Sequence, residues 1–156
     1  SFPTRRSSDL KIFLLTSLAL LLSACTLETD NDAGDLEGMW HLVRIENLVT
    51  GASSSVKDLS SQKVFWSFQA RLLELDDKSG GESSYLYRFQ IDNGQLTLKD
   101  PYLYDRENGD RPLTAYEATL GLYGIKSLTP MFRIEKISRR NMILNDGAVR
   151  LYFDKF

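Results

Sequence analysis

The sequence of 156 residues is poor in the side chains on which most catalytic and metal sites depend. It has one histidine, His41, and one cysteine, Cys25, so it can form neither an internal disulfide nor a zinc site with several His or Cys ligands. Its serines lie outside any nucleophile-elbow motif, and no glycine-rich phosphate-binding loop occurs. We therefore predict that the protein is not an enzyme, with no catalytic residues, no bound metal and no cofactor.

The charges show no excess of basic residues, with 19 Lys and Arg against 21 Asp and Glu. Arg139 and Arg140 form an isolated pair, which we interpret as a solvated turn, and no basic stripe occurs. A nucleic-acid partner is therefore not expected.

The sequence also lacks an apolar run of about 20 residues, the length that a transmembrane helix requires. The run from Ile12 to Leu22 is shorter, with Lys11 before it and the small residues Ser23 and Ala24 after it. This order is typical of a secretory signal peptide, which we assign to residues 11–24. Residues 1–10, SFPTRRSSDL, resemble a translated sequencing-adapter scar, and we exclude them from the fold.

The position of the single cysteine has an explanation, because Leu22-Ser23-Ala24-Cys25 resembles the lipobox of bacterial lipoproteins. The resemblance implies that the Cys25 thiol is lipidated, that a peptidase cuts before it, and that the new amine is acylated. Two or three acyl chains would anchor the protein stably in a membrane. Thr26 follows in place of an aspartate, which favours the outer membrane, with the periplasmic or surface face left open. Residues 25–36 are rich in Asp and Glu and predict an acidic flexible tether.

Short stretches of alternating apolar and polar residues fill the predicted domain, residues 37–156, and indicate strands. The predicted strands cover 38–48, 63–75 (readable as two strands meeting near Arg71), 85–91, 95–99, 131–137, 141–145 and 148–156. Turn sequences at Asp92–Gly94 and Asn145–Gly147 predict hairpins. A polar loop at 100–112 and one short helix, from near Leu113 to Gly121 or Gly124, interrupt the strands. We expect an all-β fold, a small antiparallel up-and-down barrel of about eight strands, and a monomer.

Two segments of the predicted domain resemble known proteins. Leu36 to Glu46 contains Gly38-Met39-Trp40 and resembles the first strand of lipocalins and of the lipocalin-like lipoproteins of Bacteroidota. Tyr123 to Phe156 also resembles these lipoproteins. The sequence departs from lipocalins in lacking a disulfide and in placing its helix in mid-chain. The resemblance implies a small lipocalin-like barrel that binds an apolar or amphipathic ligand.

Large aromatic side chains fall on the predicted inner face of the barrel. Alternation groups Val64, Trp66, Phe68 and Ala70 on one face of their strand, and Tyr85, Tyr87, Phe89 and Ile91 on one face of the next. From this pattern the predicted ligand-binding residues are Trp40, Trp66, Phe68, Tyr85, Tyr87 and Phe89. An eight-stranded barrel is either filled by side chains or holds one small ligand. Buried tyrosine hydroxyls need partners, which favours a pocket.

Other interpretations stay open. The barrel interior could be packed, with the loops Asp76–Ser84 and Asp100–Pro112 docking a protein or glycan. The barrel could itself span the outer membrane, although most predicted strands are shorter than the 9–11 residues that a bilayer requires. Asp105, Glu107 and Asp110 could hold a cation or act as an acid pair, but we interpret them as a solvated loop. His41, next to Trp40, is expected on the outer surface.

Overall fold

The computed structural model describes residues 33–48 and 55–156, which belong to one compact unit. Cys25, the predicted signal peptide and most of the predicted tether lie outside these residues. The elements in chain order are η1 (Gly34–Leu36), β1 (Gly38–Asn47), β2 (Val56–Asp58), β3 (Val64–Gln69), β4 (Leu72–Asp77), β5 (Ser84–Asp92), β6 (Gln95–Tyr104), β7 (Arg111–Pro112), η2 (Ala118–Tyr123), β8 (Met131–Ile137), β9 (Asn141–Asn145) and β10 (Val149–Lys155).

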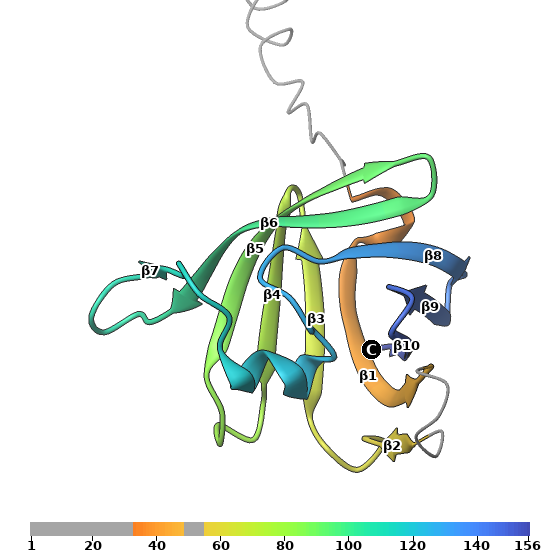
Figure 1. Ribbon diagram of the computed structural model, residues 1–156, viewed down its shortest axis with the longest axis horizontal. Helices are drawn as coiled ribbons and strands as arrows, with labels where there is room; N and C mark the ends of the chain where they lie inside the picture. Colours follow the sequence, from red (N-terminus) through yellow and green to blue (C-terminus); the bar gives the residue numbers. More distant parts are fainter. Residues whose placement is uncertain (1–32, 49–54) are drawn as a thin grey trace, which may run out of the picture. The chain divides into compact units, whose positions relative to one another are not determined.

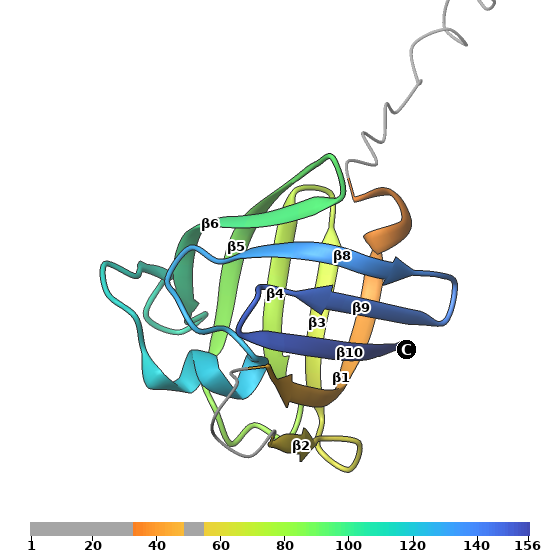
Figure 2. The ribbon, with the colours of Figure 1, turned by 45° about the vertical axis from the view of Figure 1, so that its right-hand side comes forward.

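Eight of the strands form a closed antiparallel ring (Figures 1 and 2). The ring runs β1, β3, β4, β5, β6, β8, β9, β10, and β10 pairs back with β1 to close it. The two remaining short strands pair outside this order, β2 with β1 and β7 with β6. Closure removes the long unpaired edges that promote aggregation. The predicted up-and-down barrel of about eight strands is confirmed.

The predicted hairpin turns connect the strands of the ring. Between β5 and β6, Asn93 and Gly94 have φ values of 47° and 75°, the left-handed pair that a type I′ turn requires. The segment at 63–75 forms two strands that meet at Ala70 and Arg71, as one interpretation allowed. Ala70 has a φ of 53° and is exposed, so its predicted position on the inner face is wrong. A residue in this turn no longer follows the alternation of the strand.

The polar segment at 100–112, predicted as a loop, contains the end of β6 and all of β7. β6 continues through Pro101, where the register with β5 shifts, and Asp100 has a φ of 49°. A proline lacks the amide proton for a regular ladder, and such an irregularity accommodates it. Beyond this point β6 pairs with β7 instead of β8.

The predicted helix is shorter and of a different type. η2 is a six-residue 3-10 helix that begins at Ala118, well after the predicted start near Leu113. Its buried residues, Leu120 and Tyr123, are three positions apart, which matches the 3-10 repeat. It ends at Gly124, whose φ is 80°. No helix in the described part of the chain is long and apolar enough to cross a membrane.

The domain begins before the predicted boundary at residue 37. Ala33 and Leu36, which we assigned to the tether, are each 1% exposed and belong to the core. The indole nitrogen of Trp40 donates a hydrogen bond to the Leu36 carbonyl at 2.7 Å. The 3-10 turn η1 is therefore part of the barrel and covers one of its ends.

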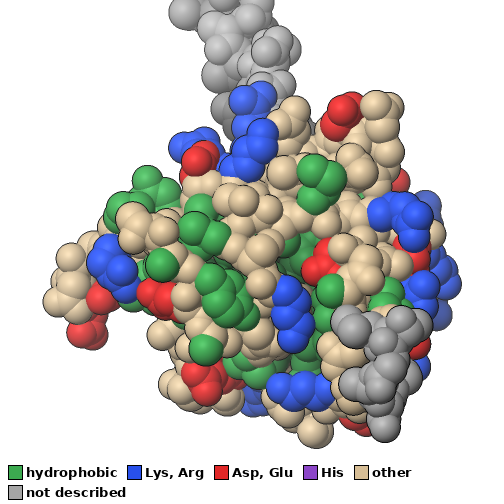
Figure 3. Space-filling model, in the orientation of Figure 1, with side chains coloured by type: hydrophobic (Ala, Val, Ile, Leu, Met, Phe, Trp, Pro, Cys, Tyr) green, Lys and Arg blue, Asp and Glu red, His purple; other side chains and the backbone are tan. Residues whose placement is uncertain are grey.

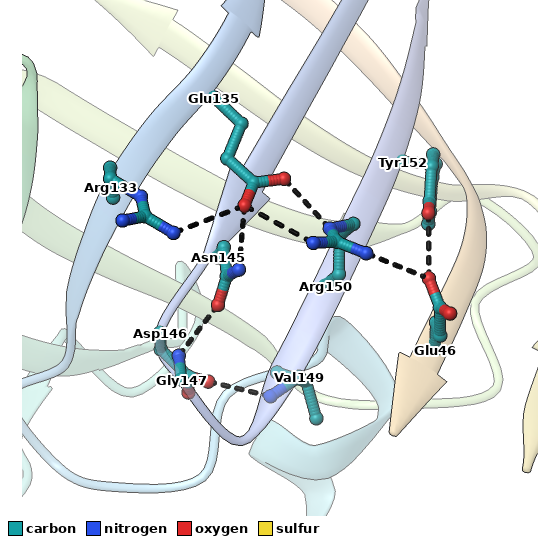
Figure 4. A network of polar contacts seen from close by, with 9 residues as sticks. All are labelled: Glu46, Arg133, Glu135, Asn145, Asp146, Gly147, Val149, Arg150 and Tyr152. Atoms are coloured by element: carbon teal, nitrogen blue, oxygen red, sulfur yellow. Dashed lines mark hydrogen bonds and ion pairs between the residues drawn. The ribbon is translucent and has the colours of Figure 1, made fainter. Parts of the chain in front are cut away.

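A polar network joins β8, β9, β10 and β1 on the outer face of the barrel (Figure 4). Glu135 accepts hydrogen bonds from Arg150 Nε and Asn145 Nδ2, each at 2.7 Å. Arg150 also reaches Glu46 at 3.4 Å, and Glu46 accepts a hydrogen bond from the Tyr152 hydroxyl at 2.6 Å. The bonds from Arg150 and Asn145 lower the pKa of Glu135 to about 2.

Stability is expected to fall as the pH is lowered from about 4.5 towards 2, and Glu135 contributes to this fall. Its folded-state pKa of about 2 lies below the ordinary value of 4.5, so its contribution is present above pH 4.5 and lost on protonation. Glu135→Gln should flatten this pH dependence in denaturant unfolding measured between these limits. Glu107→Gln, in an exposed loop, is the control. Equal pH slopes for the Glu135→Gln variant and the unsubstituted protein would contradict the assignment.

Candidate functional site in the barrel interior

The six predicted ligand-binding side chains lie together inside the barrel. Trp40, Trp66, Tyr85 and Tyr87 have no exposed area, Phe68 is 1% exposed and Phe89 is 8% exposed. They come from β1, β3 and β5, and Trp40 lies directly opposite Trp66 in the register. Periodicity therefore placed these residues on the correct face, and their binding of a ligand stays a prediction. Ile91, predicted on the same face, is 38% exposed because β5 extends beyond the end of its pairing with β4 there.

Trp66 is the centre of an aromatic cluster that spans the interior. Its ring centroid lies 5.2 Å from that of Phe153 and 5.7 Å from that of Phe132, both in edge-to-face geometry. Phe68 is 6.3 Å away and in turn packs against Phe89 at 5.2 Å. Because Phe132 and Phe153 come from β8 and β10, this cluster connects opposite walls of the barrel. Edge-to-face pairs of this kind stabilise a core beyond the area that they bury.

The 3-10 helix η2 covers the end of the barrel opposite η1 (Figures 1 and 2). The Trp66 indole nitrogen donates a hydrogen bond to the Tyr123 carbonyl at 3.2 Å. The Tyr123 hydroxyl donates to the Ser83 carbonyl at 2.8 Å, which ties η2 to the connection between β4 and β5. The sequence analysis did not identify Tyr123 as an interior residue. Its position three residues after the apolar Leu120, the spacing of a 3-10 helix, could have indicated this.

Tyr85 connects the interior to charged residues at the surface. Its hydroxyl donates a hydrogen bond to Glu117 Oε2 at 3.0 Å, and the other carboxylate oxygen of Glu117 lies 3.3 Å from Arg111. Burial, followed by the nearby Glu117 carboxylate, raises the pKa of the Tyr85 phenol. The hydroxyl therefore remains a donor over the physiological pH range.

The hydroxyl of Tyr87 is buried and, within the described residues, has no hydrogen-bond partner. Tyr87 lies opposite Leu73 of β4. Burial raises the pKa of its phenol far above the ordinary value, so the group keeps its proton. An unpaired buried hydroxyl costs about 1–3 kcal/mol. This group is thus a donor that an additional molecule in the interior would satisfy.

Tyr87→Phe is expected to leave the free energy of unfolding unchanged or to raise it by up to about 2 kcal/mol, because it removes an unsatisfied polar group. Tyr123→Phe is the matched comparison, since it breaks the bond to Ser83 and should lower the free energy of unfolding by about 1 kcal/mol. Urea unfolding of both variants measures the difference. An equal loss in the two variants would indicate that Tyr87 has a partner in the folded protein.

The other candidate residues lie outside the barrel. Asp105 accepts hydrogen bonds from the amides of Glu107 and Asn108, each at 3.0 Å, and Asp110 accepts one from the Asp105 amide. These bonds order the loop, which agrees with the interpretation of a solvated loop. Among residues 33–48 and 55–156, no group of three or more His, Cys, Asp or Glu side chains could hold a metal ion.

His41 lies on the outer wall and stacks on Phe65, with ring centroids 5.0 Å apart. Phe65 is only 6% exposed, although alternation places it outside, because Phe156 packs edge-on against it at 5.2 Å. The sequence pattern indicated the direction of Phe65 but not its burial, since the residue that covers it comes from the other end of the chain.

Comparison with known proteins agrees with this architecture. The family described as "Lipocalin-like domain" matches residues 20–156. The chain resembles the crystal structure of a lipocalin-like protein from Bacteroides uniformis, with a TM-score of 0.56 and 19% sequence identity, over 79% of this chain and 100% of that one. It also resembles an uncharacterized protein from Bacteroides eggerthii, with a TM-score of 0.51 and 13% identity, over 77% of this chain and 98% of that one. At these identities the likeness establishes the fold.

No curated protein has a significant match to this sequence. The family match covers most of the chain, including all of the barrel described above. The closed ring of eight strands and the short 3-10 helix are consistent with it. The chain therefore belongs to the lipocalin-like domain family.

Proposed function

We propose that this protein is a cell-envelope lipoprotein, anchored to the outer membrane through Cys25, whose barrel binds a small apolar or amphipathic ligand. The main support for ligand binding is the hydroxyl of Tyr87. This donor is buried among aromatic and aliphatic side chains and has no hydrogen-bond partner within the described residues. The lipocalin-like fold supports a binding role rather than a catalytic one.

The charges of the interior restrict the ligand. Among the described residues, the buried charged side chain is Asp77, whose carboxylate accepts a hydrogen bond from the Ser79 amide at the end of β4. A ligand that carried a charge into the aromatic cluster would therefore find no counter-ion there, at a cost of several kcal/mol. The proposed ligand is neutral at its buried end and carries an oxygen that accepts a hydrogen bond from Tyr87.

The two tryptophans of the chain provide the measurement, because both lie inside the barrel. Titration with a long-chain alcohol should change tryptophan emission in a saturable way, and the fatty acid of equal length should bind more weakly. Tyr87→Phe should weaken binding of the alcohol about 2- to 10-fold, the worth of one neutral hydrogen bond. Tyr102→Phe, on the outer wall, should leave it unchanged. The absence of a saturable change with either compound would contradict a ligand site in the barrel.

A second function is favoured by the dense aromatic packing around Trp66 and by the covering of both ends by η1 and η2. In this case the barrel is a packed scaffold, and its loops at 76–84 and 100–112 dock a protein or glycan. Substitutions on the surface of these loops would then abolish binding to the partner without changing tryptophan emission.

The anchor is tested separately. Intact mass of protein extracted from membranes should correspond to a chain that begins at Cys25 and carries acyl groups. Cys25→Ser should leave the precursor uncleaved by the lipoprotein peptidase. A mass equal to that of the unmodified chain would contradict the anchor.

A further inference from the structure

One end of the barrel is defined by the N-terminal residues of the domain. Gly38, directly after η1, lies opposite Phe68 near the end of β3, so η1 and the turn at Ala70 and Arg71 share an end. The β5–β6 hairpin reaches the same end, since Arg88 lies opposite Leu72, the first residue of β4. Figures 1 and 2 show these segments together at the top of both views. We call this end the tether end.

The tether end exposes two apolar and two basic side chains: Leu72, Arg88 and Lys99 lie on the outer wall, and Ile91 lies on the other face of β5, near the β5–β6 turn. Leu72 is 46% exposed and Ile91 is 38% exposed. Arg88 lies between Leu72 and Lys99 in the register of β4, β5 and β6, and all three side chains are exposed. Lys99 Nζ contacts the amide oxygen of Gln90 at 3.0 Å. In the described part of the chain, the ion pairs to carboxylates involve neither Arg88 nor Lys99.

The two ends of the barrel differ in charge. At the tether end, residues 33–37, 70–72, 88–99, 138–140 and 154–156 carry six Lys and Arg against four Asp and Glu. At the opposite end, residues 55–63, 76–83, 104–130 and 146–148 carry six Lys and Arg against nine Asp and Glu. In Figure 3, some Lys and Arg side chains lie at the top of the view, and others lie along its right-hand edge. The tether end therefore has a net positive charge, and the opposite end of the barrel has a net negative charge.

The length of chain before the domain limits how far this end can lie from a membrane anchor. Seven residues lie between Cys25 and Ala33, and the eight residue steps that join them span at most about 29 Å when fully extended. If Cys25 is lipidated, which is part of the function proposed above, the tether end stays close to the lipid headgroups. Basic residues near a membrane surface are attracted by anionic lipids, and exposed apolar side chains add to this attraction at the interface.

We infer that the tether end docks on the membrane surface, with Arg88 and Lys99 facing anionic lipid headgroups and with Leu72 and Ile91 entering the interfacial layer. The opposite, acidic end, with η2 and the loops at 76–84 and 104–111, then faces away from the membrane. The sequence before the domain contains Glu28, Asp30 and Asp32, whose carboxylates would compete for the same cations. Glu28→Gln, Asp30→Asn and Asp32→Asn together should therefore strengthen docking.

The experiment uses the lipidated protein in vesicles of phosphatidylcholine, with or without phosphatidylglycerol. The described domain contains no cysteine, so a single introduced thiol can carry a fluorophore. Gln69→Cys places the label at the tether end, and Ala115→Cys places it on an exposed residue at the opposite end. Nitroxide-headgroup lipids should quench the label at residue 69 about threefold more than the label at residue 115 when phosphatidylglycerol is present.

Two pairs of substitutions identify the groups responsible. Arg88→Gln with Lys99→Gln should reduce the dependence on phosphatidylglycerol, and Leu72→Ser with Ile91→Ser should reduce quenching in both kinds of vesicle. Lys57→Gln with Lys63→Gln, the same charge change at the opposite end, should have no effect. Equal quenching at the two labels in protein that floats with the vesicles would overturn the docking but leave the anchor intact. Protein that does not float with the vesicles would refute the anchor, and the docking with it.

Discussion

Trp66→Ala is expected to lower the free energy of unfolding by about 3–5 kcal/mol. The side chain has no exposed area and makes ring contacts with residues from three strands. Its removal leaves a cavity in the middle of the aromatic cluster, because Phe132 and Phe153 are held by their own strands and cannot fully fill the space. The Tyr123 carbonyl also loses the indole donor at 3.2 Å, which weakens the attachment of η2.

Urea unfolding measures this effect, and Tyr102→Ala is the matched control. Tyr102 is an aromatic residue of β6 that is 38% exposed, so its truncation should cost much less than that of Trp66. A similar, small loss in both variants would mean that Trp66 is not part of a packed core. A small loss combined with altered binding of a fluorescent apolar probe would instead indicate that Trp66 lines a cavity.

Gly124→Ala is expected to lower the free energy of unfolding by about 2–5 kcal/mol, from two separate causes. Gly124 ends η2 with a φ of 80°, a conformation in which a side chain is strained. A Cβ atom there would lie 2.4 Å from Leu151 Cδ2 and 3.1 Å from Leu151 Cδ1. Leu151 is fully buried on β10, so its side chain can move only by displacing close-packed neighbours. The glycine therefore allows η2 to close the end of the barrel.

Gly147→Ala separates the two causes. Gly147 has a φ of 91° but no atom within 4 Å of an added Cβ, so this substitution introduces strain without a clash. Thermal or urea unfolding should show a larger loss for Gly124→Ala than for Gly147→Ala. Adding Leu151→Ala should then cost less in the Gly124→Ala background than in the unsubstituted protein. Equal losses at the two glycines would show that the contact with Leu151 is relieved without cost.

Alternation of apolar and polar residues in the sequence predicted which side chains face the interior of the barrel. Trp66, Phe68, Tyr85 and Tyr87 were placed correctly because side chains in a strand point alternately to the two faces of a sheet. The turn at Asn93 and Gly94 could also be predicted, since few residues other than Asn and Gly adopt the left-handed conformation easily. These features depend on neighbours in the chain and are therefore visible in the sequence.

The predictions were wrong where the local structure depends on segments that are distant in the sequence. Ile91 continues the alternation of Tyr85, Tyr87 and Phe89, yet it is exposed because β5 extends beyond the strands that would cover it. Segment 100–112 contains two prolines and several charges, which are typical of a loop. β6 nevertheless continues through it, because β5 on one side and β7 on the other provide its hydrogen bonds.

The sequence by itself determined the lipobox-like motif at Cys25, the class of fold and the inner faces of β3 and β5, because each depends on residues close together in the chain. Only the tertiary structure decided that β10 pairs with β1 to close the ring, that η1 and η2 cover its ends, and that the Tyr87 hydroxyl is left without a partner among the described residues. It also brought Leu72, Arg88, Ile91 and Lys99 to one end of the barrel. These arrangements depend on pairing and burial between residues far apart in the chain, which local periodicity does not specify.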